Sequence, residues 1–274
     1  MSDKKSAIGV FDSGLGGLSA IKQLKKLLPN EHFIYFGDTG RVPYGTRSFE
    51  TVLQYADDDM RFLMDFNIKA AVVACGTVSA IALSALKEKF PLPIIGAINP
   101  ACCAAAQASK TKNIAVFATQ ATINRKAFDE ELQKLDPAIS VYPVACPMFV
   151  PLIEGGYIDR NCKVTRLIAA EYLEHIKGKN IDTLILGCTH YPIIKELIGD
   201  VAKEVLGYEI TVIDSGLEAA KATREVLLEL NLANECENEG SVSYFVSDET
   251  QNFKTTASIF LGEPAKNVTK VTIG

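Results

Sequence analysis

Short apolar runs alternate with segments of helical periodicity along the whole chain, and this alternation constrains the fold more than any other feature. Seven runs are bounded by turn residues: Ile8 to Phe11, Phe33 to Phe36, Ala70 to Ala74, Ile94 to Ile98, Ile114 to Ala118, Thr183 to Leu186 and Ile210 to Ile213. Between the first two, leucines and isoleucine recur at helical spacing from Leu18 to Leu28, and Pro29 ends the predicted helix. Strands that alternate with helices form βα units, so the sequence predicts an α/β fold with mainly parallel sheets.

Two short sequence motifs each occur twice in the chain, and this repetition predicts two similar structural units. Phe11-Asp12-Ser13-Gly14-Leu15 is matched by Ile213-Asp214-Ser215-Gly216-Leu217, and Val73-Ala74-Cys75 by Leu186-Gly187-Cys188, each cysteine being followed shortly by a threonine. In both cysteine segments the thiol comes just after a buried strand. Because open α/β sheets bind their ligands at the carboxyl ends of the strands, both thiols are expected at a ligand site. A tail that alternates from Ser241 to Ser247 and then turns helical is expected to return to the first unit.

Composition and charge exclude several classes of protein. The chain has 274 residues, of which 48% are hydrophobic, and this is enough for one large core or two small ones. No apolar run approaches the roughly 20 residues that a membrane span needs, and no signal core precedes the first strand, so we expect a cytoplasmic protein. The net charge of −5 argues against a nucleic-acid partner, which usually requires a basic surface.

The cysteines follow no pattern of disulfide or metal binding. There are seven, an odd number, and none are paired at C-x-x-C spacing. Most free cysteines are buried as small apolar residues, so a functional role needs a local reason. No metal site is expected.

Cys188 and Cys75 have such a reason. Cys188 stands at a predicted strand end and helix start, two residues before His190, and both surroundings favour a thiolate. The residues around Cys75 are similar to those around Cys188, and this similarity favours a functional role for Cys75 as well. Two thiols in equivalent positions suit a reaction in which one removes a proton and the other returns it on the opposite face. No lysine lies in a motif that would hold a pyridoxal cofactor, so we expect a cofactor-free route.

The loop Asp12-Ser13-Gly14-Leu15-Gly16-Gly17 has a rival interpretation as a dinucleotide site. Its first two glycines fit the fingerprint, and Asp38 stands about where a ribose-binding acid belongs. Against this, Ser19 occupies the third glycine position and the Asp12 carboxylate would face the pyrophosphate. We therefore prefer Asp12 as a base or orienting group near Cys75.

Two further segments supply candidate site residues. The loop Arg41-Val42-Pro43-Tyr44-Gly45 follows a strand, and its amides and the Tyr44 hydroxyl are candidates to hold a carboxylate, although an ordinary turn fits the pattern equally well. Glu154 follows the apolar, proline-bounded segment that begins at Cys146. This acid fits a half-buried site position or the start of a solvated loop.

Taken together, these segments resemble the glutamate racemases over nearly the whole chain. The matching segments are Gly9 to Gly17, Asp38 to Gly45, Cys75 to Ala80, Cys146 to Gly156 and Leu186 to Pro192. The resemblance implies two pseudo-symmetric α/β domains with the active site in the cleft between them. The first is expected to comprise residues 1–98 and 211–274, and the inserted second domain residues 99–210.

The resemblance also implies a chemistry without metal or cofactor. Cys75 would deprotonate D-glutamate with help from Asp12, and Cys188 would deprotonate L-glutamate. Glu154 and His190 would assist Cys188. The residues expected to bind the substrate are Asp12, Ser13, Pro43, Tyr44, Gly45, Gly76, Thr77, Thr119, Thr122, Thr189 and His190. Family members supply D-glutamate for peptidoglycan, and many are homodimers, which we expect here.

Two departures from the family pattern leave alternatives open. Gly76 replaces an asparagine, so one hydrogen bond to the substrate is expected to be missing, at a cost of about 1.5 to 3 kcal/mol. A large gain of activity in Gly76→Asn would show that this position limits the enzyme. Asn99-Pro100-Ala101 replaces Glu-Pro-Gly near the presumed domain junction. The alternatives are a racemase for another acidic amino acid, such as aspartate, and a binding or regulatory protein that has lost turnover.

Overall fold

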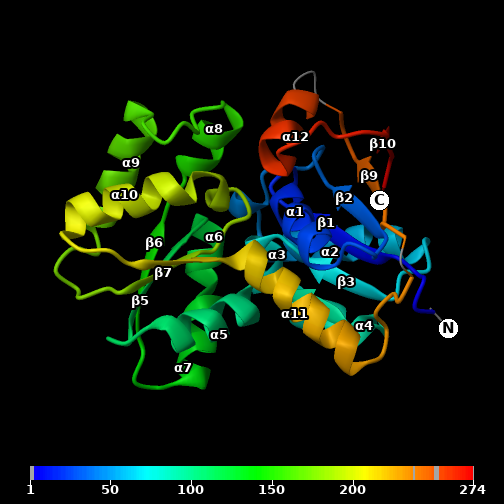
Figure 1. The fold of residues 1–274 in the computed structure, drawn as a ribbon, viewed down its shortest axis with the longest axis horizontal. Coiled ribbons are helices and arrows are strands. Elements are labelled where there is room, and N and C mark those ends of the chain that lie inside the picture. Colours follow the sequence, from blue (N-terminus) through cyan, green and yellow to red (C-terminus); the bar gives the residue numbers. More distant parts are fainter. Residues whose placement is uncertain (1–2, 237, 250–252, 274) are drawn as a thin grey trace.

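The strands form two separate parallel sheets in the computed structural model, which describes residues 3–236, 238–249 and 253–273 (Figure 1). The six-stranded sheet has the order β10-β9-β2-β1-β3-β4, and the four-stranded sheet has the order β6-β5-β7-β8. The strands of the first are β1 (Ile8–Asp12), β2 (Phe33–Gly37), β3 (Ala70–Val73), β4 (Ile94–Gly96), β9 (Val242–Val246) and β10 (Val268–Lys270). Those of the second are β5 (Asn113–Ala118), β6 (Ser140–Ala145), β7 (Thr183–Leu186) and β8 (Thr211–Asp214). The predicted α/β class is confirmed.

Helices cover the faces of both sheets, as buried parallel strands require. Every residue of the central strands β1, β3 and β7 is buried. The helices are α1 (Leu18–Leu27), α2 (Phe49–Met64), α3 (Gly76–Ile81), α4 (Leu83–Lys89), α5 (Ile98–Ala108), α6 (Gln120–Arg125), α7 (Ala127–Leu135), α8 (Phe149–Glu154), α9 (Lys163–Glu174), α10 (Lys195–Leu206), α11 (Ser215–Glu229) and α12 (Phe253–Leu261). Short 3-10 turns lie at η1 (Tyr44–Thr46) and η2 (Tyr191–Ile194). Among the described residues, no helix is both long and apolar enough to cross a membrane.

The chain passes between the sheets twice. It leaves the first sheet after β4 through α5, and it returns from β8 through α11, which packs against α1 and α5 (Figure 1). The segment 211–214, which the sequence division assigns to the first unit, pairs with β7 and completes the second sheet. The chain therefore crosses back to the first sheet after Asp214. The predicted domain boundary, between residues 210 and 211, lies one strand too early.

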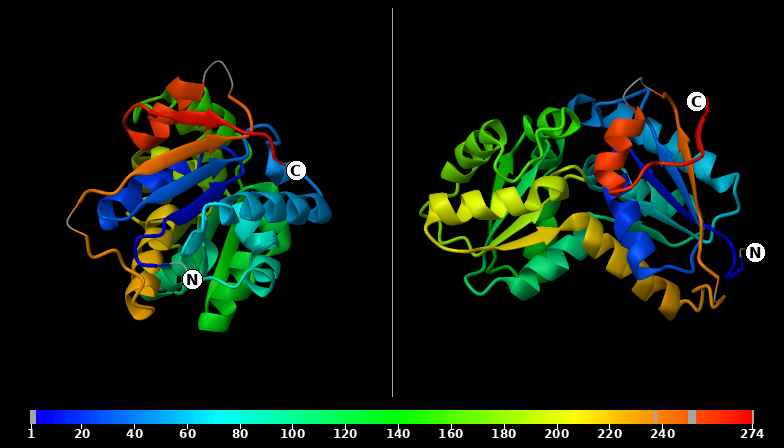
Figure 2. Two further views of the ribbon diagram at one scale, coloured as in Figure 1. Left: turned by 90° about the vertical axis from the view of Figure 1, so that its right-hand side faces the viewer. Right: turned by 45° about the horizontal axis from the view of Figure 1, so that its top comes forward.

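The tail returns to the first sheet as its alternation predicts. β9 pairs in parallel with β2, and α12 packs against α1 (Figure 2). Two strands, β6 and β10, were not predicted from the sequence. β6 is an edge strand that carries Pro143 and has no fully buried residue, so it lacks an apolar run. β10 is three residues long and mostly exposed.

A buried ion pair fixes the start of β3 against the N-terminal segment. The Nζ atom of Lys69 lies 2.5 Å from Oε2 of Glu31, and both side chains are almost fully buried. The same Nζ donates to the carbonyl oxygen of Lys4 at 2.6 Å, and the other carboxylate oxygen of Glu31 accepts from the amide of Asn234 at 2.8 Å. Removing one partner would leave a buried charge without compensation.

We predict that Lys69→Met lowers the free energy of unfolding by about 3 to 5 kcal/mol, because the Glu31 carboxylate loses its buried counter-charge. Urea unfolding followed by circular dichroism measures this change. The control is Lys177→Met, since the Lys177 pair with Glu174 is half-exposed and is expected to contribute at most about 1 kcal/mol. Equal effects of the two substitutions would contradict the prediction.

Candidate active site

The carboxyl ends of strands from both sheets meet around one cavity of about 420 Å³. Asp12 ends β1, Cys75 follows β3, Thr119 follows β5 and Cys188 follows β7. This is the edge at which parallel sheets bind ligands. Each sheet contributes one thiol to the lining of this cavity, as the two repeated motifs predict.

Cys75 is a buried thiol in an electronegative position. It caps the N-terminus of α3, and its Sγ donates to the Ser13 hydroxyl at 3.4 Å. Burial, followed by the negative charge of Asp12, raises the pKa of Cys75 to about 12, and a negative charge on Cys188 also raises it. The neutral thiol is therefore the form of Cys75 that the protein favours at neutral pH.

Cys188 lies beside a positively charged histidine. Its Sγ is 3.9 Å from Nδ1 of His190, whose Nε2 is 2.9 Å from Oε1 of Glu154. Burial alone would lower the pKa of His190, but the hydrogen bonds to Cys188 and Glu154 and the charges of both raise it to about 10. The ring is therefore an imidazolium at neutral pH, and it presents a positive charge to the sulfur.

The loop after β1 closes around its own carboxylate. Asp12 is fully buried, and its Oδ2 accepts from the amide of Gly14 at 3.0 Å, while Oδ1 accepts from the Thr189 hydroxyl at 3.3 Å. The amide of Gly17 also bonds to Asp12, and burial raises the pKa of this carboxyl despite the His190 charge and these donors. Because the loop amides already bind a carboxylate, they do not form a phosphate cradle, and the dinucleotide interpretation is wrong.

Three threonines join the two sheets at the pocket wall. Oγ1 of Thr77 lies 3.1 Å from Oγ1 of Thr119 and 3.4 Å from that of Thr122, and the last two are 2.9 Å apart. Thr77 and Thr119 line the cavity, whereas Thr122 is buried behind them. The cluster offers hydroxyl donors and acceptors to the polar group of a ligand.

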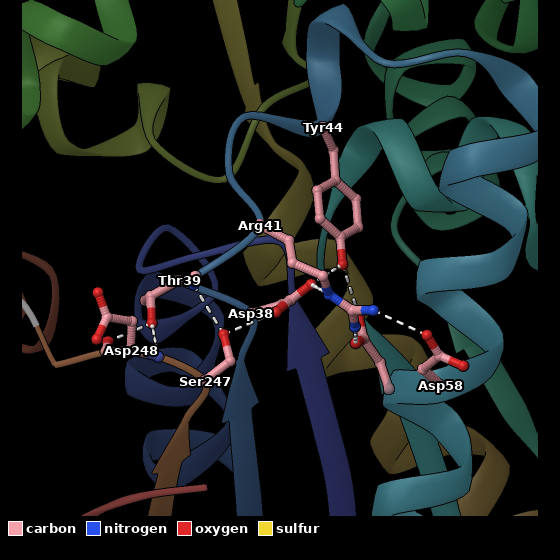
Figure 3. A network of polar contacts seen from close by, with 9 residues as sticks. Asp38, Thr39, Arg41, Tyr44, Asp58, Ser247 and Asp248 are labelled. Atoms are coloured by element: carbon pink, nitrogen blue, oxygen red, sulfur yellow. Dashed lines mark hydrogen bonds and ion pairs between the residues drawn. The ribbon is translucent and has the colours of Figure 1, made fainter. Parts of the chain in front are cut away.

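The loop after β2 lines the pocket and is anchored from below by a buried polar network (Figure 3). Arg41 binds Asp38 at 2.5 Å, Asp58 at 2.8 Å and Asp59 at 2.9 Å. From the end of β9, Ser247 donates to the other oxygen of Asp38 at 2.7 Å. Asp38 thus holds the loop in place, and this role replaces the ribose contact considered for it.

The Tyr44 hydroxyl belongs to this network. It donates to Asp38 and lies 3.2 Å from Oδ2 of Asp59, and the side chain is almost fully buried. The Tyr44 hydroxyl thus already binds carboxyl groups of the protein, and its contact with a substrate carboxylate stays a prediction; Tyr44 and Gly45 both line the cavity. Burial, followed by the charge of Asp38, raises the pKa of Asp59 well above its usual value, which reduces repulsion among the three carboxyl groups around Arg41.

Gly76 stands where the two sheets touch. A Cβ atom at this position would lie well inside 3.0 Å of the carbonyl oxygen of Gly187. The glycine is therefore required by a backbone contact across the cleft, and an asparagine does not fit without a shift. The missing hydrogen bond to the substrate stays a prediction, and an asparagine at position 76 would have to displace the Gly187 carbonyl to supply it.

The structure brings most of the predicted site residues together. Those that line the cavity are Ser13, Pro43, Tyr44, Gly45, Cys75, Gly76, Thr77, Thr119, Glu154, Cys188, Thr189 and His190. Asp12 and Thr122 lie in the layer behind it. An apolar wall of the cavity at the start of α8, made by Pro147, Val150 and Pro151, was not predicted. Its signal was present in the proline-bounded apolar segment from which only Glu154 was selected.

One small pocket lined by a buried thiol from each of two parallel sheets suits an isomerase that moves protons at a single carbon. The family model for Asp/Glu/Hydantoin racemase matches residues 8–223. A glutamate racemase of Geobacter metallireducens is 41% identical over 267 residues, which cover 97% of each chain. The crystal structure of the Francisella tularensis glutamate racemase in complex with D-glutamate has a TM-score of 0.90 at 37% identity and covers 98% of each chain.

The chain therefore belongs to the Asp/Glu/Hydantoin racemase family and is an amino acid racemase. Within that family its near-full-length similarity is to the glutamate racemases, which confirms the resemblance seen in the motifs. The aspartate racemase of Picrophilus torridus is 18% identical with a TM-score of 0.56, and this likeness shows the shared fold alone.

We predict that Tyr44→Phe lowers the free energy of unfolding by about 1 to 3 kcal/mol, because two buried carboxyl groups lose their shared donor. Thermal and urea unfolding measure the change. The control is Tyr157→Phe, whose side chain is half-exposed. Unchanged stability together with a raised KM would show that the hydroxyl faces the ligand instead.

A second prediction concerns the charge of His190. In ¹⁵N NMR titrations its ring is expected to lose a proton near pH 10, and Glu154→Gln is expected to shift this titration to lower pH because a charged acceptor is lost. Glu174→Gln, which alters an exposed ion pair, serves as the control and is expected to leave the titration in place. A ring that titrates near 6.5 in the unmodified protein contradicts the prediction.

Proposed function

We propose that this chain interconverts L- and D-glutamate by a two-base mechanism in which Cys75 and Cys188 work from opposite faces of the α-carbon. The observation that carries the proposal is the single cavity lined by both thiols, each at a strand end of its own sheet. The near-full-length similarity to glutamate racemases supports the substrate.

Each turnover moves one proton off the α-carbon and another onto it. With D-glutamate bound, the thiolate of Cys75 takes the α-proton, and the electron pair of the broken C–H bond remains on carbon. The S–H of Cys188 then delivers its proton to the opposite face, which leaves Cys188 as the thiolate. The reverse sequence converts L-glutamate, so the protein ends each turnover in the form that the other enantiomer requires.

The main energetic cost of the reaction is the difference in acidity between the α-proton of the substrate and a thiol. The α-proton of an amino acid is far less acidic than a thiol, and each pK unit of mismatch costs about 1.36 kcal/mol. The raised pKa of Cys75 makes its thiolate a stronger base once it forms, but forming it at neutral pH without substrate costs on the order of 7 kcal/mol. A bound α-ammonium group offsets this cost, because it brings a positive charge beside Asp12 and the Cys75 thiolate.

The other side chains around the pocket orient the substrate and stabilise charge. We propose that Asp12 orients the substrate ammonium beside Cys75, while the His190 imidazolium, held by Glu154, stabilises negative charge on Cys188. The threonine pair Thr77 and Thr119 supplies hydroxyl groups for a substrate carboxylate. These groups act in a buried site, where electrostatic stabilisation of the carbanion is strong.

The two sheets are proposed to act as two domains that close on the substrate, with the second crossing after β8. The supply of D-glutamate for peptidoglycan and the homodimer stay predictions from the family resemblance, and the cytoplasmic location stays a prediction from the sequence. Racemisation of aspartate and a purely binding role are the rival functions. The pair of pocket-lining thiols favours turnover over binding, since binding needs no proton carriers.

The test is deuterium incorporation in D₂O with each enantiomer of glutamate and of aspartate. Deuterium is expected at the α-carbon of inverted glutamate, with glutamate preferred over aspartate. Cys75→Ala and Cys188→Ala are each expected to lower racemisation by about 10²- to 10⁴-fold or more, because each removes one proton carrier. Cys103→Ala, on α5 and outside the cavity lining, is the matched control. Full racemisation by either active-site variant rejects the mechanism, and no label in glutamate rejects the function.

A further inference from the structure

The two cysteine-bearing turns touch through their backbones. Gly76 directly follows Cys75, and Gly187 directly precedes Cys188, and all four residues line the cavity. The Cβ position of Gly76 falls well inside 3.0 Å of the Gly187 carbonyl oxygen, and real Cβ atoms essentially never come so close to another atom. No side chain other than hydrogen fits between the turns, so at this point the sheets have reached their closest approach.

Tethers beside this point hold the turns together. The Ser19 hydroxyl of α1 donates to the carbonyl oxygen of Thr189 at 2.8 Å, and the Thr189 hydroxyl donates to Asp12. Gly16 lies equally close beneath Thr189 and His190, whose side-chain atoms would collide with a Cβ atom there. The tethers and the Gly76–Gly187 contact therefore lie at the same junction between the two sheets.

We infer that Gly76 is a positioning residue for the reaction: its contact with the Gly187 carbonyl sets the separation of the two sulfurs and so decides how often the carbanion is inverted. This inference rests on the proposed two-thiol function. Gly76 itself carries no proton and offers no side chain to the substrate. It acts through the distance between Cys75 and Cys188.

Two proton transfers to the carbanion compete with one another. Once Cys75 has taken the proton, the carbanion either receives a proton from Cys188 and inverts, or takes one back from Cys75 and keeps its configuration. A methyl group at position 76 must push the turns apart by about 1 Å to reach van der Waals contact. The more distant sulfur then delivers its proton more slowly, while return from the nearer sulfur is unaffected.

The experiment compares Gly76→Ala with Gly199→Ala in D₂O. Gly199 lies in α10 with open space around its Cβ position, so it is a matched helical glycine without the contact. Gly76→Ala is expected to lower kcat for racemisation on the order of 100-fold, as for a 1 Å misplacement of reacting groups. Because a slower Cys188 step lengthens the life of the carbanion, the Cys75 S–H has more time to exchange with D₂O before its proton is returned. The ratio of deuterium in the unconverted enantiomer to deuterium in the inverted product is therefore expected to rise several-fold.

The ratio separates positioning from a general loss of structure. A damaged or partly unfolded protein lowers exchange and inversion together, so a fall in kcat with an unchanged ratio overturns the inference. Values equal to those of Gly199→Ala also overturn it. If the unmodified protein does not racemise glutamate at all, the proposed function fails, and the inference that rests on it fails with it.

A second variant covers the case in which Gly76→Ala does not fold. Ser19→Ala removes a tether without adding any atom, and it is expected to raise the same ratio to a smaller extent because the turns are held together less firmly. Ser258→Ala, which removes an exposed hydroxyl that bonds within α12, is its control. An unchanged ratio in Ser19→Ala counts against the inference as directly as an unchanged ratio in Gly76→Ala.

Discussion

The contact between the backbones of two turns, at Gly76 and Gly187, is the constraint on which the rest of the site depends. Parallel sheets place their strand ends at one edge, so each sheet can present one thiol, but neither sheet alone can surround a small molecule. In this chain no side chain lies between the edges at position 76, and one cavity is lined by both thiols. The cross-sheet bonds of Ser19, Thr77 and Thr189 then fix the relative position of the edges.

The electrostatics of the pocket complement this geometry. On the Cys75 side a buried carboxylate raises the pKa of the thiol, and on the Cys188 side an imidazolium faces the sulfur. The two halves are thus unequal in the absence of substrate. A zwitterionic amino acid carries both signs of charge, and its ammonium group suits the side where Asp12 lies. The buried network around Arg41 keeps the neighbouring loop in place without using its own charges on the ligand.

The local part of this arrangement could be predicted from the sequence. The seven apolar runs correspond to strands, and both cysteines lie where a strand end places them, because periodicity and turn residues act over short distances. β6 was missed because an edge strand with Pro143 needs no apolar run. The direction of the Tyr44 hydroxyl depends on Asp38 and Asp59, which only the fold brings beneath it. The close contact of Gly76 is with Gly187, which lies 111 positions later in the chain. No local sequence pattern predicts such a contact.

The most direct measurement is a crystal structure of the protein with D-glutamate bound. The account predicts that the sulfurs of Cys75 and Cys188 both lie about 3 to 3.5 Å from the α-carbon, on opposite faces, as near-attack geometry requires. It also predicts that the Gly76–Gly187 contact is intact in that complex. A bound glutamate with only one sulfur within reach, or with the two turns separated, would contradict it.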